Sequence, residues 1–581
     1  MYCRVIACDF DGTAGNDHGL APEVAAALGA ARARGIRVLL VTGRILEDVQ
    51  TLCEDLSLFD AVVAENGAIV HLPGSQRTIS LGEPPPEHFL GELRARGVPF
   101  HAGAVIVGTW DRHVHDVLDL VRRQSIDGQL IFNRGAMMLL PSGINKAVGT
   151  RRALDELRRS EHNLIAFGDA ENDLPLLAMA EVAVVARGAA PAIAAQADYQ
   201  LSQAGSAGVA QYVHRLLQRG GSVPTPPRHH IVLGSSADGT NVVLPGSGLN
   251  VMITGDPRSG KSWLAGLFAE QLLERNYRVC VIDSEGDYLS LAQRPRVLLL
   301  GNDLALPEPA AVTRVLRDEP LSLVLNLAPL SLREQVRYVD DLLDQLQVCS
   351  AEIGLPQWIL IDEAQYFFHE ADTSVRRFQS SANFLFVTYR PSLVSDAVYA
   401  AVGAHLITPT AVEEERYLIT SLLQARGPCD LVVSEALAAL DAQRCGLLIA
   451  GAEPPQWHVF TPGERVTNHA HHGRKYADIR LPEEKAFRFL PNDGLPPSVA
   501  RNIVEFASAI ETVSPAALRY HLMHGDFSRW FAEVLGDELL ARGLRKLERA
   551  VLAGAAPNRL EILQHIQDHY RISYRSMSSA E

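Results

Sequence analysis

The sequence lacks the features that mark several special classes of protein. Its 581 residues include seven cysteines, an odd number with no CxxC pair, so neither a disulfide framework nor a zinc ribbon is indicated. No run of about 18 uncharged apolar residues occurs, and an acidic residue interrupts the N-terminal stretch before a signal-peptide core could form. Acidic residues outnumber basic ones, 68 to 53, which argues weakly against indiscriminate nucleic-acid binding. We therefore expect a cytoplasmic protein with no membrane partner.

The composition is otherwise that of an ordinary globular protein. Apolar residues make up 47% of the chain and charged residues 21%, which excludes disordered and fibrous classes. At roughly 150 residues per domain, the length indicates about four domains and more than one hydrophobic core.

Three blocks of sequence differ in pattern. Residues 1–217 and 229–465 alternate short apolar strands with helical stretches, which predicts two α/β domains built on parallel sheets. Residues 218–228 contain glycine, serine and three prolines, and are predicted to be an extended linker. Residues 466–581 show mainly helical spacing, which predicts an all-α C-terminal domain.

A pair of carboxylates follows the first strand. Asp9 and Asp11, in DFDGT, come directly after the apolar segment 5–8, where residues i and i+2 point into the crevice at the carboxyl edge of a parallel sheet. One carboxylate can be a nucleophile and the other a general acid/base, so the pair could transfer a phosphoryl group through an aspartyl-phosphate. Alone, such a pair is more often a turn or a helix cap.

Three later elements could complete a phosphate site. Thr42 and Gly43 end a second strand, where a hydroxyl and a flexible backbone N–H can hold phosphate oxygens. Lys146 opens a helical pattern and could offset the charge of a phosphate. The third element follows a further strand and comprises Asp169, Asn172 and Asp173. With Asp9 and the backbone carbonyl of Asp11, these carboxylates predict an oxygen-rich magnesium site.

In this order, DFDGT, VTGR, the isolated lysine and GDAEND resemble the haloacid dehalogenase phosphatases, specifically the Cof-type or IIB branch, which also carries a segment similar to AENGA at 64–68. The resemblance covers about residues 1–215 and implies a Rossmann-like core with a small α+β cap at about 75–140. It implies Asp9 as nucleophile, Asp11 as general acid/base, Thr42 and Lys146 on the phosphate, and Asp169 on Mg²⁺. Asn172 would support the phosphate and Asp173 the metal.

The cap is short for the branch and looks similar to the archaeal phosphoglycolate phosphatase type. The implied substrate is a small phosphorylated metabolite, which is a sugar phosphate or a phosphoglycolate-like compound. Arg134 and His101 in the cap could contact a substrate anion, but the simpler expectation is that both are solvated surface groups.

A second phosphate motif lies in the second block. The segment 255–262 satisfies GxxxxGK[ST] between a strand and a helical stretch, so its backbone N–H groups would wrap the phosphates of ATP. Lys261 would reach the β/γ oxygens and Ser262 would place its hydroxyl on Mg²⁺. The candidate ATP-binding residues are Gly255, Asp256, Pro257, Arg258, Ser259, Gly260, Lys261, Ser262 and Trp263.

An acidic pair follows the apolar strand WILI about a hundred residues later. Asp362 can hold the magnesium through water, and Glu363 can orient or deprotonate an attacking water. This adjacent glutamate favours hydrolysis of ATP over phosphoryl transfer to a second substrate.

VIDSEGDY, ILIDEAQ and FVTYRPS, in that order, resemble the HerA/FtsK-like ATPases over about residues 245–410. The resemblance implies ATP hydrolysis and possible homo-oligomers through this domain. Tyr389 stands where the family has glutamine, and the N-terminal barrel of the DNA translocases is replaced by the phosphatase, which argues against hexameric DNA pumping. Arg390 could be an arginine finger for a neighbouring subunit or an ordinary strand-end arginine paired with an acid.

Two further patterns have simple structural explanations. His469, His471 and His472 could bind a metal, but without a nearby carboxylate or cysteine ligand they are more typical of a solvated linker. Helical spacing of aromatic and leucine side chains indicates a core or docking surface in the C-terminal domain, at Phe527, Trp530, Phe531 and Leu535.

The preferred hypothesis is a magnesium-dependent phosphomonoesterase joined to an ATPase. One alternative is a polynucleotide kinase-phosphatase-like enzyme that processes nucleic-acid ends, against which Glu363 and the absence of a basic, aromatic-interleaved tract both argue. Another is a HerA-like assembly or DNA-linked ATPase with a phosphatase module.

Overall fold

A computed structural model describes the chain with the exception of residues 54, 134, 303–304, 370–382, 425–435, 438–439, 442, 450–455, 468–480, 482–484, 491–497, 536 and 571–581. The chain divides into two compact units. The first comprises residues 1–282, 291–325 and 331–466, and the second comprises 283–290, 326–330 and 467–581. Within the described residues, no helix is both long and apolar enough to cross a membrane.

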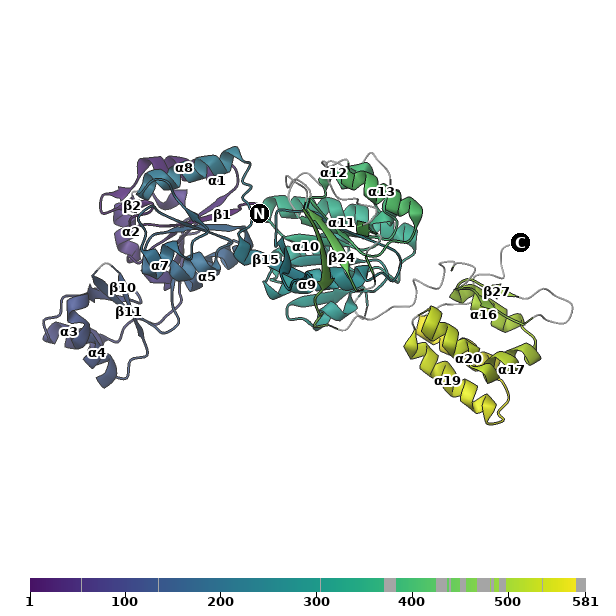
Figure 1. The fold of residues 1–581 in the computed structure, drawn as a ribbon. Helices are drawn as coiled ribbons and strands as arrows, with labels where there is room; N and C mark the ends of the chain where they lie inside the picture. Colours follow the sequence, from purple (N-terminus) through teal and green to yellow (C-terminus); the bar gives the residue numbers. More distant parts are fainter. Residues whose placement is uncertain are drawn as a thin grey trace. The chain divides into compact units, whose positions relative to one another are not determined.

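The first unit begins with an eight-stranded sheet (Figure 1). Its order is β14 (Tyr199–Gln200), β13 (Val182–Val185), β12 (Leu164–Gly168), β1 (Val5–Asp9), β4 (Arg37–Val41), β5 (Ala61–Ala64), β6 (Ile69–Leu72) and β7 (Arg77–Ser80). The strands from β14 to β5 are parallel, and the last two are antiparallel. The carboxyl ends of β1, β4 and β12 therefore meet at one edge, which is where the predicted phosphate elements follow each strand.

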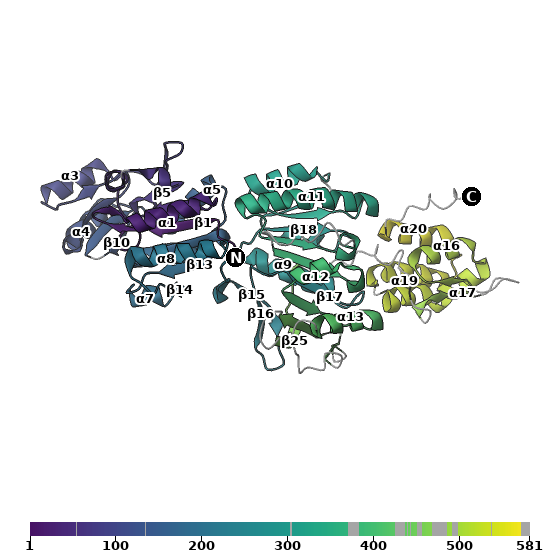
Figure 2. The same ribbon diagram turned by 90° about the horizontal axis from the view of Figure 1, so that it is seen from above.

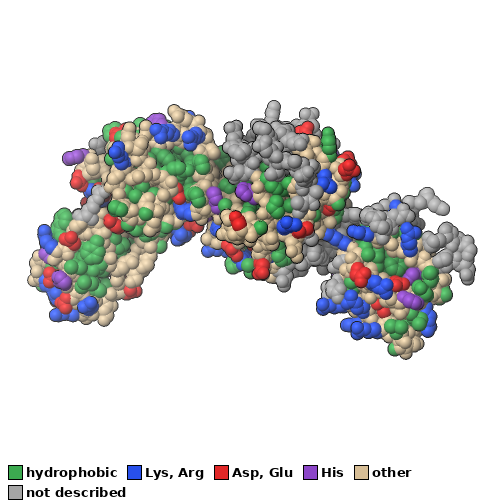
Figure 3. Space-filling view, viewed as in Figure 1, with side chains coloured by type: hydrophobic (Ala, Val, Ile, Leu, Met, Phe, Trp, Pro, Cys, Tyr) green, Lys and Arg blue, Asp and Glu red, His purple; other side chains and the backbone are tan. Residues whose placement is uncertain are grey.

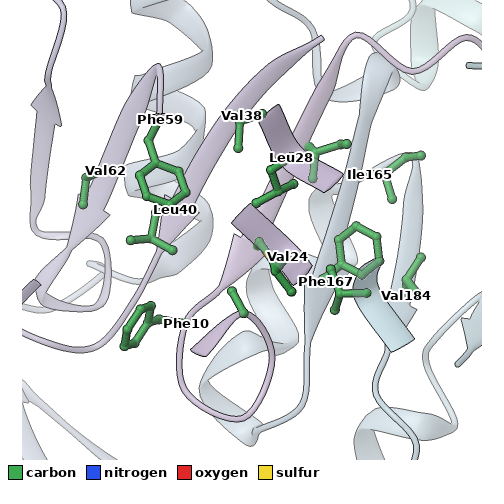
Figure 4. Packing of buried hydrophobic residues seen from close by; sticks show 14 of the residues in the cluster. Phe10, Val24, Leu28, Val38, Leu40, Phe59, Val62, Ile165, Phe167 and Val184 are labelled. Carbon is green, nitrogen blue, oxygen red and sulfur yellow. The ribbon is translucent and has the colours of Figure 1, made fainter. Parts of the chain in front are cut away.

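Helices cover both faces of this sheet. Alternate residues of β1 point to opposite sides, so Ile6 and Cys8 pack in one apolar core and Val5 and Ala7 in the other. Figure 4 shows the first core, which α1 (Pro22–Ala33) and α8 (Gly205–Gln218) complete. The second core is completed by α5 (Lys146–Glu156), α6 (Leu174–Met179) and α7 (Pro191–Ala194). The expected Rossmann-like core is thus confirmed.

The cap is a separate four-stranded antiparallel sheet with two helices and its own apolar core. Its elements are β10 (Gln129–Asn133), β11 (Ala136–Leu140), β9 (Val107–Trp110), β8 (His101–Ala102), α3 (Glu87–Ala95) and α4 (Val114–Arg123). Strand β7 lies inside the range predicted for the cap but belongs to the core sheet, because it pairs with β6 over four residues. Acidic and basic side chains are interspersed on the cap surface in Figure 3.

The same unit contains an eleven-stranded sheet. Its order is β16 (Asn241–Pro245), β15 (His230–Ser235), β25 (Gln456–Pro462), β24 (Cys445–Ile449), β23 (Ala404–Ile407), β17 (Val251–Thr254), β22 (Asn383–Thr388), β21 (Trp358–Ile361), β18 (Val279–Asp283), β20 (Ser322–Asn326) and β19 (Val297–Leu300). The central strands from β23 to β18 are parallel, as predicted, whereas β16, β15, β25 and β24 add an antiparallel extension.

Among the described residues, helices α9 to α13 accompany this sheet (Figure 2). They are α9 (Lys261–Glu274), α10 (Pro309–Asp318), α11 (Leu332–Ile353), α12 (Asp396–Ala401) and α13 (Glu413–Gln424). Local sequence sets the limits of α11, because Ser331 and Glu334 form a capping box at its start and Gly354 takes a left-handed conformation at its end. Gly260, also left-handed, precedes α9.

The Pro-rich segment predicted as an extended linker is packed within the first unit. The backbone N–H of Cys3 donates to the Gly221 carbonyl, and Val223 and Thr225 are buried. Close by, the buried Glu181, the residue directly before β13, accepts hydrogen bonds from His162 Nδ1 at 2.7 Å and from the hydroxyl of Tyr277 at 2.8 Å. Because Tyr277 follows α9, Glu181 joins the two sheets of this unit through side-chain contacts.

The second unit is mainly helical, as predicted. It contains α16 (Ile503–Thr512), α17 (Pro515–His524), α18 (Asp526–Arg529), the π-helical turn η12 (Trp530–Val534), α19 (Glu538–Leu552) and α20 (Arg559–Tyr570), with the short strands β26 (Phe487–Arg488) and β27 (Val499–Ala500). The aromatic pattern predicted there forms its core: Phe527 and Phe531 are fully buried, and Trp530 stacks on Phe506 with a centroid separation of 4.9 Å.

Candidate functional sites

Asp9 and Lys146 meet in the interior of the first domain. The Lys146 Nζ atom lies 2.6 Å from Asp9 Oδ1 and 2.5 Å from Asp173 Oδ1, and all three side chains are buried. Lys146 is placed by local capping, because the Asn145 side chain accepts from the N–H groups of Ala147 and Val148 and so begins α5 at the lysine. The structure thus brings together residues 137 positions apart in the chain.

A third carboxylate completes an acidic cluster. One carboxylate oxygen each from Asp9, Asp169 and Asp173 lies within 4.8 Å of the others, and all three residues are buried. Asp173 is fixed in place because its Oδ2 accepts from the N–H groups of Asp169 and Ala170, both at 3.0 Å. Mg²⁺ takes oxygen ligands, and it is usually held by one or two carboxylates together with water and substrate phosphate, so this group of carboxylates fits the predicted ion. The carboxylate of Asp11 is not part of this group.

Burial and charge act on the protonation of this cluster. Burial raises the pKa of Asp9 well above its usual range, and the adjacent Asp173 raises it further, while Lys146 opposes both effects. Burial would lower the pKa of Lys146, but the charges of Asp173 and Asp9 outweigh it and raise the pKa above its ordinary value. The lysine is therefore a fixed positive charge at the site.

Asp11 is held by Arg44, an arginine for which the sequence motifs predict no role. Arg44 Nε lies 2.8 Å from Asp11 Oδ2 and Arg44 Nη2 lies 2.5 Å from Asp11 Oδ1, which is a two-point contact. Arg44 Nη2 also reaches Asp17 Oδ1 at 2.6 Å. The signal was present, since Arg44 is the last residue of VTGR, directly after the predicted phosphate-binding pair.

The remaining predicted phosphate residues are close neighbours. Thr42 is fully buried, and its hydroxyl accepts from the N–H of Arg44 at 3.1 Å. A Cβ added to Gly43 would lie 3.7 Å from Asn172 Nδ2 and 3.5 Å from the Cε of Met138, a cap residue. Thr42, Gly43 and Asn172 therefore gather on one side of the site, beneath the cap.

The P-loop has the predicted setting between β17 and α9. Lys261 is buried and its Nζ donates to the backbone carbonyl of Asp256 at 2.8 Å. The loop is tied to the next strand of the sheet, because the hydroxyls of Ser259 and Thr408 form a hydrogen bond and a side chain at Gly255 would collide with Thr408. No motif marked Thr408, which only the pairing of β17 with β23 brings to the loop.

The acidic pair Asp362 and Glu363 follows β21, a strand of the same sheet as β17, and both side chains are buried. Asp362 and Glu363 are 0% and 1% exposed, and Glu363 has a left-handed backbone conformation with φ of 52°. Gln365 Nε2 donates to Glu363 Oε2, and the Thr388 hydroxyl donates to Gln365 Oε1, both at 2.6 Å. Glu363 is therefore oriented through Gln365 by Thr388, the last residue of β22.

The other predicted residues have varied surroundings. Trp263 is 36% exposed, and its indole N–H donates to the Gly463 carbonyl at 3.3 Å. The side chain of Arg390 is exposed, and its backbone N–H donates to Thr388. His101 is exposed, as expected. The predictions on Arg134, His469, His471 and His472 fall outside the described residues.

Comparison with known proteins agrees with both motif sets. A family model described as haloacid dehalogenase-like hydrolase matches residues 6–81 and 128–213, and one described as the central domain of helicase HerA matches residues 253–354. The phosphoglycolate phosphatase of Methanothermobacter thermautotrophicus is 31% identical over 221 residues, which are 37% of this chain and 99% of that protein. The phosphoglycolate phosphatase of Pyrobaculum islandicum is 29% identical over 194 residues, 31% of this chain and 81% of that protein.

Among solved structures, a haloacid dehalogenase-like hydrolase from Bacteroides thetaiotaomicron shows 17% identity and a TM-score of 0.33, and the alignment covers 37% of this chain and 99% of that one.

The chain belongs, through its N-terminal part, to the haloacid dehalogenase-like hydrolases. It is an enzyme that joins a phosphatase domain of this family to a HerA-like domain.

Proposed function

We propose that the chain is a magnesium-dependent phosphomonoesterase for a small phosphorylated metabolite, joined to a domain that hydrolyses ATP. The observation that carries the first half is the buried cluster of Asp9, Lys146 and Asp173, with Asp169 beside it. The names of the relatives favour phosphoglycolate or a similar small ester as substrate. We also propose domain limits of 1–217, 229–465 and 466–581, with 218–228 between the first two.

In the first chemical step, a carboxylate oxygen of Asp9 attacks the phosphorus of the ester. The new bond joins Asp9 to phosphorus, the bond from phosphorus to the ester oxygen breaks, and the departing oxygen takes a proton from Asp11. Arg44, which contacts Asp11 at two points, holds this acid in place until substrate binds. The products of this step are an alcohol and an aspartyl-phosphate.

In the second step, water attacks the aspartyl-phosphate. Asp11, now ionised, accepts the proton of the water, the bond between Asp9 and phosphorus breaks, and inorganic phosphate leaves. Lys146 and Thr42 contact the phosphoryl oxygens during both steps, where a fixed positive charge and a donor stabilise developing negative charge. A magnesium ion held by Asp9, Asp169 and Asp173 would polarise the phosphoryl group and offset the repulsion that raises the pKa of Asp9.

The second half of the proposal rests on the P-loop and the buried acidic pair. Lys261 and Ser262 stand at the start of α9, where backbone N–H groups and the helix terminus favour the phosphates of ATP. Glu363 orients the attacking water. The hydrogen bonds from Gln365 to Glu363 and from Thr388 to Gln365 fix the direction of the Glu363 carboxylate.

A screen of full-length protein across phosphoglycolate, sugar phosphates and nucleotides, with Mg²⁺ and with or without ATP, tests the phosphatase half. We expect hydrolysis of at least one small ester, its loss in Asp9→Asn, and its loss when Mg²⁺ is chelated. If Asp9→Asn left every rate unchanged, the assignment of the nucleophile would be wrong.

A parallel variant tests the ATPase half. Lys261→Ala removes the charge that contacts the β/γ oxygens, so we expect ATP turnover to fall below detection while ester hydrolysis remains measurable. Loss of both activities in this variant would show instead that ester hydrolysis depends on the ATP site.

A second function is supported by the match to the central domain of HerA. In this alternative, ATP drives assembly of the chain or work on DNA, and the phosphatase is an attached module. Sedimentation with and without ATP, together with ATP turnover measured with and without DNA, separates the two. ATP-dependent oligomers and DNA-stimulated turnover would favour the alternative.

A further inference from the structure

The turn Glu65–Gly67 (η2), directly after β5, contacts the elements that carry the predicted phosphate-binding residues. The N–H of Asn66 donates to the Thr42 carbonyl at 3.0 Å, and Asn66 Oδ1 accepts from Asn172 Nδ2 at 3.3 Å. Gly67 packs closely on the backbone of Asn145, the N-cap residue of helix α5. A Cβ atom on Gly67 would collide with the Asn145 carbonyl. The turn therefore lies against the Thr42 loop, the Asp169–Asp173 turn and the start of the helix that carries Lys146.

Two polar atoms of this arrangement are buried without a partner. Among the described residues, neither Asn66 Nδ2 nor Asn172 Oδ1 has a hydrogen-bond partner. Asn66 is 0% exposed and Asn172 is 6% exposed, so open solvent does not satisfy them. Native structures rarely leave a buried amide donor unsatisfied, and a bound ligand is one of the few reasons for doing so.

The backbone of the turn is strained, and the cap holds it. Glu65 and Asn66 have φ values of 51° and 55°, a left-handed conformation that non-glycine residues adopt at a cost. The buried Glu65 carboxylate accepts from the N–H groups of Ala104, Val105 and Ile106 at 2.8, 2.8 and 3.0 Å. These residues form the loop between β8 and β9, so the cap fixes the direction in which Asn66 points.

We propose that Asn66 is a further substrate-binding residue, whose Nδ2 donates a hydrogen bond to an oxygen of the phosphoryl group, with Glu65 as the positioning residue that holds the turn. The inference rests on the proposed phosphatase function. We choose the phosphoryl group, rather than the organic part of the substrate, because Asn66 hydrogen-bonds to Thr42 and to Asn172. Both of these residues lie next to Gly43, Thr42 in the sequence and Asn172 in space. A phosphoryl oxygen is also an acceptor of the kind that an unsatisfied amide N–H requires.

The test measures binding of inorganic phosphate by calorimetry to full-length protein with Mg²⁺. Lys261→Ala is the parent, because the P-loop would otherwise bind phosphate as well. Asn66→Gly removes the amide and keeps the backbone, since glycine adopts a φ of 55° freely. Asn66→Asp keeps the shape but replaces the donor with a negative charge. The matched control is Asn241→Ala, at an exposed asparagine of β16.

We expect Asn66→Gly to bind phosphate roughly tenfold or more weakly than the parent, and Asn66→Asp more weakly still because its carboxylate repels the anion. Asn241→Ala should stay within about twofold of the parent. Affinity of Asn66→Gly within about twofold of the parent would overturn the inference, even if Asn66→Asp failed to fold. The proposed function fails by a different result, which is absence of ester hydrolysis by the unmodified chain.

Discussion

At the scale of single residues, the proposed phosphatase site is centred on one lysine that two carboxylates share. Lys146 contacts Asp9 and Asp173 at 2.6 and 2.5 Å in the protein interior, where charges interact far more strongly than in water. Without the ammonium group, two buried carboxylates would face each other unpaired. In the proposed mechanism, Lys146 would therefore offset both the charge of the Asp9 nucleophile and the charge of the phosphate.

Lys146→Met keeps the length of the side chain and removes its charge. We expect the rate of ester hydrolysis to fall by roughly 10²- to 10³-fold, because one preorganised group that stabilises transition-state charge is lost. Steady-state kinetics with the best ester from the screen measures the change. ATP turnover is the internal control, and an unchanged rate of ester hydrolysis would remove Lys146 from the mechanism.

At the scale of elements, the cap loop is built around Glu65. A Cβ on Gly103 would lie 2.6 Å from the Glu65 carboxyl carbon, so the loop passes too close to Glu65 for any larger residue. Three N–H groups converge on one carboxylate, and a glutamine side chain cannot reproduce this arrangement because one of its terminal atoms is a donor.

Glu65→Gln should therefore loosen the cap loop without unfolding the core sheet. We expect hydrogen exchange at the amides of Ala104, Val105 and Ile106 to become at least about tenfold faster, at a cost in stability of roughly 1–3 kcal/mol. Glu47→Gln, at an exposed position of α2 (Leu46–Leu52), is the matched control. Equal exchange in the two variants would show that Glu65 does not hold the loop.

At the scale of the whole molecule, Glu181 is one of the side chains that link the two sheets of the first unit, through its hydrogen bonds with His162 and Tyr277. Burial would raise the pKa of Glu181, but hydrogen bonding and the charge of His162, with smaller contributions from His229 and Tyr277, lower it overall. A carboxylate with a depressed pKa stabilises the folded state above its unfolded pKa and loses that contribution as the pH falls through the folded pKa.

Glu181→Gln should thus destabilise the first unit by about 1–3 kcal/mol at pH 7, since it disturbs the buried hydrogen bonds with His162 and Tyr277. The difference from the unmodified protein should shrink as the pH falls below about 4.3, the ordinary pKa of a glutamate, and vanish once the pH has passed through the lower pKa that Glu181 has in the folded protein. Thermal unfolding followed over a pH series measures both. A difference that stays constant from pH 7 to pH 3 would show that the charge of Glu181 is not the cause.

Much of both sites could be predicted because the motifs are local. DFDGT places Asp9 at the end of a buried strand, and GxxxxGKS places Lys261 at the start of a helix, since strand and helix limits follow from nearby residues. The antiparallel extension of the second sheet and the packed course of residues 218–228 were not foreseen. Both depend on pairing with distant segments, as β15 pairs with β25 across more than two hundred residues.

The sequence by itself determined which chemical groups are present, their order, and the strand ends and helix starts that carry them, because these depend on neighbouring residues. Only the tertiary structure decided which groups meet. It paired Arg44 with Asp11, placed Thr408 beside Gly255, and set Asn66 between Thr42 and Asn172. Such contacts arise from the order of the strands and from the docking of the cap, which bring together groups that are far apart in the chain. No local sequence pattern predicts which of these distant groups will meet.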